Sequence, residues 1–216
     1  MCGRFTLTTT NEELMHRFGI RLDQNLQPRY NIAPTHKTLI LRPNIHNQVS
    51  SYKAIMAQFG LPSAAGSNML INARSETVTE KPTFADAFKQ SRCLVLSDGW
   101  YEWDAKRTPY HIHLKDKRTM VMAGLLFKRG SRLHFTIVTG AAQGRMAEMH
   151  HRTPVILPKA YWWKWLVDQP ADAEKYLVSP SDKFFAWHEV DKAVGKVAND
   201  RPEVMAPVAS AGALFG

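Results

Sequence analysis

The chain has 216 residues, of which 44% are hydrophobic and 22% charged, a balance typical of a globular protein of one domain. Lys and Arg number 28 against 19 Asp and Glu, and the formal net charge of +9 favours a polyanionic partner such as nucleic acid. The sequence has no apolar run of the roughly 20 residues that span a membrane, no secretory signal pattern and only two cysteines, so we expect a cytoplasmic protein without a disulfide framework or a membrane partner.

The predicted elements are short and follow one another closely. Thr10 and Glu13 form a capping-box pattern, which predicts a helix that ends at Gly19. Short apolar runs rich in β-branched residues predict strands at 38–41, 69–73, 93–96, 110–114, 120–125, 133–138 and 155–157. Helical patterns follow at 84–89, 161–167 and 171–176.

Strands without regular alternation with helices indicate an α+β fold. We expect a single domain over residues 1–216, with a bent or barrel-like, mainly antiparallel sheet and short surrounding helices. The last residues, about ten of them, are expected to form a loose tail.

The first candidate site is the N-terminus, which reads Met1-Cys2-Gly3-Arg4. Removal of Met1 would leave Cys2 with an α-amine and a thiol on adjacent carbons, and both groups have reactive fractions near neutral pH. An aldehyde forms an imine with such an amine, and the thiol then closes a five-membered thiazolidine ring in an intramolecular step. From position alone, the alternative is an ordinary residue at a frayed terminus.

Two further segments place polar groups beside apolar ones. Asn72 and Arg74 end a predicted strand, where an amide and a guanidinium can hold a hydroxyl and a phosphate, although a solvated turn is the alternative. Glu102 lies between Trp100 and Trp103, and burial among aromatic rings raises a carboxyl pKa and suits a proton shuttle. Both tryptophans are more readily explained as core than as stacking platforms.

The histidines divide into two groups. His150 lies two residues before Arg152, which suits proton transfer near a phosphate. His111 and His113 share one face of a predicted strand, but the sequence offers no third ligand, so we expect no metal site. Cys93 lies in an apolar run and is interpreted as an inert core thiol.

Taken together, these segments resemble the SOS-response-associated peptidase (SRAP) family. The matching segments are, in chain order, residues 1–5, 29–34, 71–77, 98–103 and 150–154, and a similar segment follows at 187–195. Each motif is weak alone, but the series spans nearly the whole chain in the expected order.

The resemblance implies an α+β protein that senses and shields abasic sites in single-stranded DNA, joining the nucleoid when bound. It implies a lyase-like activity without cofactor, in which Cys2 cross-links to the ring-opened sugar as a thiazolidine. The family name reflects a proposed autocatalytic removal of the first residue, for which a host aminopeptidase is the simpler route. We expect a monomer.

The family's site positions carry over residue by residue. The expected catalytic residues are Cys2, Asn72, Glu102 and His150, with Asn72 orienting the amine and sugar, Glu102 relaying protons at the amine, and His150 protonating the leaving sugar oxygen. The expected DNA contacts are Arg4, Arg74, Arg152, Asn31, Pro34, Trp103 and Thr139.

One segment departs from the family pattern. The family commonly has Trp-Gly-Leu-x-Pro followed by further aromatic residues, whereas residues 59–65 here read Phe-Gly-Leu-Pro-Ser-Ala-Ala. Base–aromatic stacking contributes about 1–3 kcal/mol per base, so the change bears on DNA affinity and on any preference for strand junctions, while the cross-linking chemistry is left intact.

Two other function classes remain open. Glutamine amidotransferases of the N-terminal-nucleophile type also begin Met-Cys-Gly, but they usually feed an attached synthetase domain, for which 216 residues leave little room. A non-catalytic nucleic-acid-binding module, in which Cys2 is incidental, is the third. Glutaminase activity would favour the former, and DNA binding unaffected by Cys2→Ala the latter.

Overall fold

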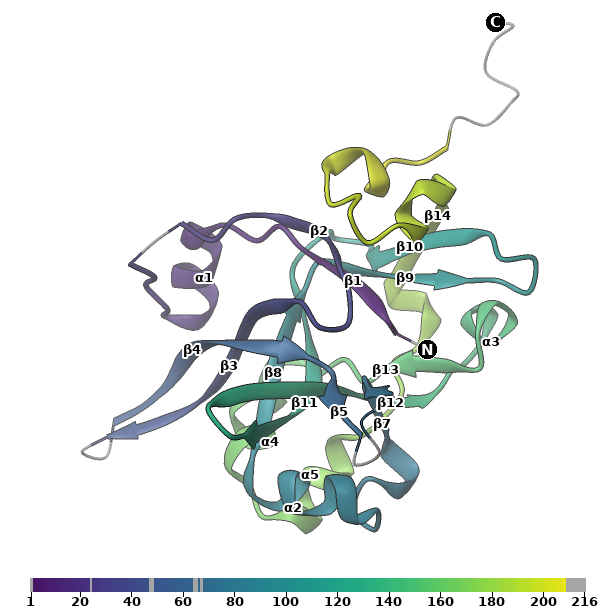
Figure 1. Ribbon diagram of the computed structural model, residues 1–216. Coiled ribbons are helices and arrows are strands. Elements are labelled where there is room, and N and C mark those ends of the chain that lie inside the picture. Colours follow the sequence, from purple (N-terminus) through teal and green to yellow (C-terminus); the bar gives the residue numbers. More distant parts are fainter. Residues whose placement is uncertain (1, 24, 47–48, 64–65, 67, 209–216) are drawn as a thin grey trace, which may run out of the picture.

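Two sheets of antiparallel character, one above the other in Figure 1, make up the computed structural model of the chain. It describes residues 2–23, 25–46, 49–63, 66 and 68–208, so the predicted C-terminal tail lies almost wholly outside the described residues. Among the described residues, no helix is both long and apolar enough to cross a membrane.

The upper sheet has five strands in the order β14-β10-β9-β1-β2, and every neighbouring pair is antiparallel. In chain order these strands are β1 (Arg4–Leu7), β2 (Arg29–Ile32), β9 (Gly99–Trp103), β10 (Pro109–Leu114) and β14 (Phe185–Glu189). Side chains alternate between the two faces of such a sheet. Phe5, Trp100 and Ile112 therefore share the face that packs on the main core, where all three are buried.

The lower sheet closes on itself. Its strands are β3 (Lys37–His46), β4 (Val49–Phe59), β8 (Arg92–Ser97), β11 (Met120–Arg129) and β12 (Arg132–Ala141). They follow the order β11-β8-β3-β4-β12, and the additional pairing of β11 with β12 completes a barrel. The α+β fold with a barrel-like, mainly antiparallel sheet is therefore confirmed.

Two short strands pair with the last residues of β12. β7 (Asn72–Arg74) runs parallel to β12, and β13 (Arg152–Pro154) pairs with it antiparallel. A separate small pair is formed by β5 (Leu61–Pro62) and β6 (Met69–Leu70). Figure 1 shows the start of β1 beside β12, β13 and the short helix α3 (Arg145–Met149).

The first helix, α1 (Asn11–Phe18), begins and ends where the sequence predicts. Thr10 Oγ1 accepts a hydrogen bond from the backbone N–H of Glu13 at 3.2 Å. Gly19 ends the helix at φ 65°, a left-handed conformation that glycine adopts without strain.

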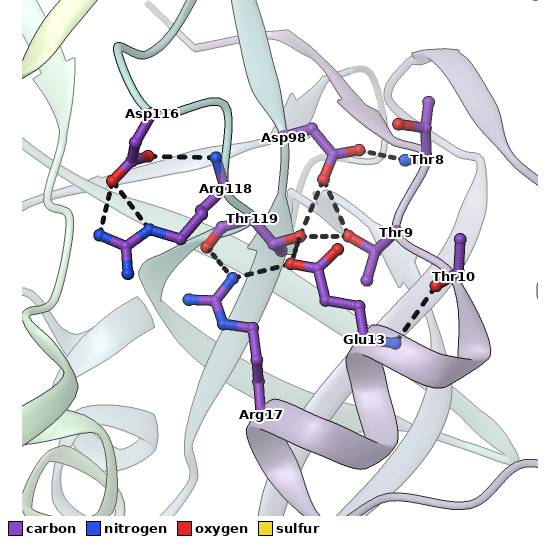
Figure 2. Close-up of polar contacts among 9 residues, drawn as sticks. All are labelled: Thr8, Thr9, Thr10, Glu13, Arg17, Asp98, Asp116, Arg118 and Thr119. Carbon is purple, nitrogen blue, oxygen red and sulfur yellow. Dashed lines mark hydrogen bonds and ion pairs between the residues drawn. The ribbon is translucent and has the colours of Figure 1, made fainter.

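A polar network fastens α1 to both sheets. Figure 2 shows its members, which are Thr8, Thr9, Glu13, Arg17, Asp98 and Thr119. The Asp98 carboxylate accepts hydrogen bonds from Thr9 and Thr119, and the Glu13 carboxylate accepts one from Thr119 at 2.9 Å. Glu13 thus uses its side chain to anchor the helix to the start of β11 as well as to pair with Arg17.

The remaining helices lie mostly below the barrel in Figure 1. They are α2 (Pro82–Gln90), α4 (Trp162–Val167) and α5 (Pro170–Ala173). The 3-10 turns are η1 (Ser75–Thr77), η2 (Lys159–Tyr161), η3 (Glu174–Tyr176), η4 (Asp182–Phe184), η5 (Lys192–Gly195) and η6 (Pro202–Met205).

Stacked aromatic rings join the upper sheet to the barrel. Phe5 packs edge-on against Phe59 with ring centroids 5.3 Å apart, and Phe59 stacks on Phe135 at the same separation. All three are fully buried. Truncating such a ring costs about 3–5 kcal/mol, so this column holds β1, and with it the N-terminal residues, against the end of the barrel.

The strand predicted at 155–157 is wrong in its position. Val155 and Leu157 are buried as an apolar run should be, but the strand here, β13, ends at Pro154, and Ile156 forms an isolated bridge with Met122. The backbone N–H of Val155 donates to Val138 on β12, whereas that of Leu157 donates to Val121 on β11, so the run crosses from one strand to the other instead of following a single ladder. The strand predicted at 69–73 is likewise divided at Ile71 between β6 and β7.

Candidate functional site

The N-terminal cysteine is enclosed by the protein. Cys2 is 0% exposed, and its carbonyl oxygen accepts a hydrogen bond from Asn72 Nδ2 at 3.2 Å. Asn72 is placed there because β7 pairs in parallel with β12, where it lies opposite Ile137. The structure therefore brings together two predicted site residues that are 70 positions apart in the sequence.

Glu102 lies on β9, beside the start of β1, and is only 4% exposed. Burial raises the pKa of its carboxyl group to about 6. Burial also raises the pKa of the Cys2 thiol well above its ordinary value, and the charge of Glu102 raises it further. The two side chains are thus within electrostatic reach, with a neutral thiol beside a carboxyl that titrates near neutral pH.

His150 lies in the extended link between α3 and β13. Its Nδ1 accepts a hydrogen bond from the backbone N–H of Arg152 at 3.0 Å in one tautomer, and donates to the carbonyl oxygen of the same residue at 3.2 Å in the other. Burial lowers the pKa of His150, which favours the neutral form. The ring stacks on His151 with centroids 4.3 Å apart. The ring of His150 is therefore oriented by the backbone of Arg152 in either tautomer.

Arg152 is held from both sides. Its guanidinium donates to the two carboxylate oxygens of Glu76 at 2.6 and 2.8 Å, and to the carbonyl oxygen of Thr139. The guanidinium lowers the pKa of Glu76 to about 2. Arg152 is only 9% exposed, whereas Arg74 is exposed at the end of β7, opposite Thr139. Of these two arginines, Arg74 is the one open to solvent.

Arg4 and Asn31 belong to a second polar network. Arg4 donates to Asn31 Oδ1 at 2.8 Å and to the carbonyl oxygens of Val194 and Gly195, each at 3.0 Å. Asn31 donates to the carbonyl of Val194 and to two others in the same turn. On β1, Arg4 pairs with Tyr101, so its side chain points to the face opposite Glu102. In this structure both residues anchor the turn at η5.

The remaining predicted DNA contacts lie at different depths. Pro34 is half-buried after β2, and Thr139 is 1% exposed within β12. Trp103 is half-buried and packs on a small core around Tyr101 and Val190, while Trp100 is fully buried. The interpretation of Trp100 as core is confirmed. Trp103 keeps one side exposed.

Residues 1–197 match the profile of the family described as SOS response associated peptidase (SRAP). The chain belongs to the SRAP family. The SRAP chain is 29% identical over 228 aligned positions to the abasic site processing protein YedK of Escherichia coli (strain K12), covering 96% of this chain and 100% of YedK. It is 32% identical over 224 positions to the abasic site processing protein YoqW of Bacillus subtilis (strain 168), covering 95% and 99% of the two chains.

Solved structures share the fold. A phage-related protein of Bordetella bronchiseptica superposes with a TM-score of 0.74 at 29% identity, covering 88% of the SRAP chain and 95% of that protein. A protein of Bacteroides thetaiotaomicron superposes with a TM-score of 0.79 at 20% identity, covering 96% and 100%. At that lower identity the likeness shows the fold alone.

Residues 59–65, where the chain departs from the common family sequence, include buried core positions as well as surface ones. Phe59, which stands where the family commonly has Trp, is fully buried and stacks on Phe135, so it offers no face to a base. Gly60 follows at φ 93°, in a conformation that favours glycine. Leu61 is also buried. Residues 64 and 65 of this segment lie outside the described residues.

A cluster of three histidines lies on the other face of the upper sheet. His111, His113 and His188 have ring centroids 5.5 to 5.7 Å apart and line a cavity of about 470 Å³. Burial lowers the pKa of His111 to about 3, so that ring is neutral at neutral pH. Within the part of the chain that the structure describes, no group of His, Cys, Asp and Glu is arranged to hold a metal ion.

Glu76 is a site residue that the sequence reasoning missed. It lies within the matched segment 71–77, yet it was given no role because its partner is 76 positions away. The only signal was opposite charge in two segments of the same series, which predicts an ion pair once both segments are placed beside β12.

Proposed function

We propose that this SRAP chain processes abasic sites in single-stranded DNA, cross-linking its N-terminal cysteine to the ring-opened sugar as a thiazolidine. The relatives named above are abasic site processing proteins, and the net charge of +9 suits a polyanionic partner. The observation that carries the proposal is the position of Cys2, which is bonded through its carbonyl to Asn72 and lies beside a buried carboxyl that titrates near neutral pH.

The chemistry begins at the α-amine that removal of Met1 leaves on Cys2. The amine attacks the C1′ aldehyde of the open sugar, a C–N bond forms, and loss of water gives an imine. The thiol sulfur then adds to the imine carbon and its proton moves to the nitrogen, which closes the ring. One water leaves for each cross-link, and neither an oxidant nor a cofactor is needed.

We assign each proton transfer in these reaction steps to a residue of the site. Glu102, with a pKa of about 6, accepts and returns protons at the amine and at the water that leaves. His150, whose ring is oriented by the Arg152 backbone, protonates the ring oxygen of the closed sugar so that the ring can open. Asn72 holds the main chain of Cys2 in place.

A protonated thiol fits an imine-first order. Burial and Glu102 both raise the pKa of the Cys2 thiol, so the thiolate is scarce and the amine is the better first nucleophile. The same shift opposes the glutamine amidotransferase alternative, because that chemistry starts with attack by the sulfur. We therefore do not favour that alternative.

We assign the DNA contacts according to exposure. Arg74 binds a backbone phosphate directly, because it is exposed at the rim of the site. Thr139 lies opposite Arg74 and borders the same region. Trp103 packs with Tyr101 on the face opposite Glu102, the face on which Arg4 and Asn31 hold the turn at η5, and Pro34 follows β2. Arg152 reaches a phosphate only by exchanging its contact with Glu76.

The test is a covalent adduct on a denaturing gel. Protein whose intact mass proves the loss of Met1 is mixed with a single-stranded oligonucleotide that carries one abasic site. Cys2→Ala and Cys2→Ser both keep the α-amine but lose the thiol, so neither should give an adduct that survives the gel. Each should instead give an imine that is retained only after reduction with borohydride. Cys93→Ala is the matched control, since Cys93 is equally buried but lies on β8 within the core.

Two results would overturn the thiazolidine assignment. One is efficient cross-linking by protein whose N-terminus carries an added residue. The other is a stable adduct formed by Cys2→Ala at the rate of the Cys93→Ala control.

A further inference from the structure

An arginine and a tryptophan that have no part in the chemistry above lie stacked beside the site. The guanidinium carbon of Arg145, the first residue of α3, lies 5.0 Å from the centroid of the Trp187 ring on β14. The backbone N–H of Arg145 donates to the Asp182 carboxylate at 2.9 Å, which fixes the start of this short helix. The side chain of Arg145 is exposed, and Trp187 is half-buried against the main core.

The register of the upper sheet places this pair on the same face as Glu102. Trp187 pairs with Ile112, and Ile112 pairs with Trp100, so the three side chains form one row across the sheet. Glu102 lies two residues beyond Trp100 and points the same way. Trp187 and Glu102 are separated by two inter-strand spacings across the sheet and by two residues along the strand. Their Cα atoms are therefore about 12 Å apart.

The chain also connects Arg145 directly to the site. α3 ends at Met149, and His150 is the next residue, so Arg145 and His150 are about 8 Å apart along the helix axis. Arg145 thus lies between the edge of the upper sheet and the imidazole that acts on the sugar in the proposed function.

The Arg145 guanidinium stacks on the Trp187 ring, and none of the ion pairs among the described residues includes it. Asp182 engages the Arg145 backbone rather than its side chain. A guanidinium held flat on an indole loses less side-chain freedom when it binds an anion, and its outer N–H groups remain free in a fork that fits phosphate oxygens. Arg152, by contrast, already has a carboxylate in that fork.

We propose that Arg145, supported by Trp187, binds a backbone phosphate of the single strand on one side of the abasic site. This inference rests on the proposed function for the position of the lesion. Arg74, at the end of β7, serves the other side, so the two exposed arginines bracket the site from opposite ends. The strand is then held across Cys2 from two points.

The experiment measures affinity for intact single-stranded DNA at several salt concentrations. Arg145→Ala should reduce the slope of log K against log salt by about 0.7, the value for one phosphate contact in a single strand. The affinity advantage of wild type over Arg145→Ala should then shrink by roughly 2.6-fold between 50 and 200 mM salt. Trp187→Phe keeps a ring and should keep the slope, and Arg145→Lys keeps the charge but should bind more weakly than wild type.

Arg132→Ala is the matched control. Arg132 is equally exposed, but it starts β12, about 24 Å along the strand from Thr139. It should leave both affinity and slope unchanged. Equal effects of Arg132→Ala and Arg145→Ala, or a lower melting temperature with an unchanged slope in Arg145→Ala, would show that the pair is structural and overturn the proposal.

Oligonucleotides shortened on one side of the abasic site locate the contact. The loss of affinity that Arg145→Ala causes relative to wild type should vanish when the strand is shortened on one side of the abasic site and persist when it is shortened on the other. For Arg74→Ala the two sides should be reversed. A deficit that persists with both oligonucleotides contradicts the proposal. Failure of the proposed function is separable: wild type that binds through Arg145 yet forms no adduct overturns the cross-linking chemistry alone.

Discussion

Arg152 and Glu76 form a two-pronged ion pair, with N–O distances of 2.6 and 2.8 Å, between a guanidinium that is 9% exposed and a carboxylate that is 48% exposed. The same guanidinium donates to the carbonyl of Thr139. The pair therefore joins η1, which follows Arg74, to β12 and to the link that carries His150. Two motif segments that are distant in the sequence are locked in one register by this contact.

The first prediction concerns the acid stability of this pair. Glu76 has a pKa of about 2 in the folded protein against 4.5 ordinarily, so its stabilising effect is complete above pH 4.5 and is lost as the pH falls towards 2. Glu76→Gln should lower the free energy of unfolding at pH 7 by about 1 kcal/mol, because water screens the half-exposed carboxylate. Urea titrations at pH 7 and pH 3 measure this. The gap between wild type and variant should narrow at pH 3, and a constant gap would contradict the assignment.

The second prediction separates phosphate binding from chemistry at Arg74. Arg74→Ala should weaken binding to intact single strands and reduce the salt slope by about 0.7. Its cross-linking rate at saturating abasic DNA should stay near that of wild type, because the exposed guanidinium is assigned to binding alone. If the rate at saturation fell while the slope was unchanged, Arg74 would belong to the chemical step.

The parts of the fold that the sequence predicted are those whose residues alternate or run apolar within one element. The runs at 93–96, 120–125 and 133–138 lie inside β8, β11 and β12, because these strands line the barrel and are buried over most of their length. β4 (Val49–Phe59) was missed, since its first residues are exposed and polar and only its end enters the core. β9 was missed because Gly99 to Glu102 are all buried, which removes the polar face that marks a strand.

The site was predictable at the level of residues but not of partners. The candidate residues Cys2, Asn72, Glu102 and His150 were selected through their segments, yet no sequence pattern predicts that Asn72 bonds the carbonyl of Cys2. That contact exists because β7 lies parallel to β12 beside the end of the barrel. Long-range register of this kind is decided by the packing of the whole barrel, so it cannot be predicted from any single segment.

A third prediction concerns the stability and pH dependence of Glu102. Its folded pKa of about 6 is above the ordinary 4.5, so the folded protein binds the proton more tightly and gains stability as the pH falls from 6 to 4.5. Glu102→Gln should remove this gain and make the protein more stable than wild type at pH 7, by at most about 2 kcal/mol. Thermal unfolding at pH 7 and pH 5 checks both. A variant less stable than wild type at both pH values would show that the carboxylate is a net structural support.

The last prediction assigns His150 and Glu102 to different steps. In the proposed function, the closed sugar must be protonated on its ring oxygen before an aldehyde appears, and His150, whose ring is oriented by the Arg152 backbone, supplies that proton. In the same proposal, Glu102 acts after the aldehyde has formed, where protons move at the amine and at the departing water. His150→Ala should therefore slow cross-linking strongly for the natural abasic site and much less for an analogue that carries a permanently open aldehyde. Glu102→Gln should slow both substrates alike.

General acid–base groups contribute about 10²–10⁴-fold, so single-turnover rates on the two substrates resolve the contrast. His151→Ala is a suitable control for the histidine variant, since the exposed ring of His151 stacks on His150, whereas it is the His150 ring that bonds to the Arg152 backbone. It should change the ratio of the two rates little. Equal slowing of both substrates by His150→Ala would move the histidine from ring opening to a later step, because a group that acts only on the closed sugar leaves the open aldehyde unaffected.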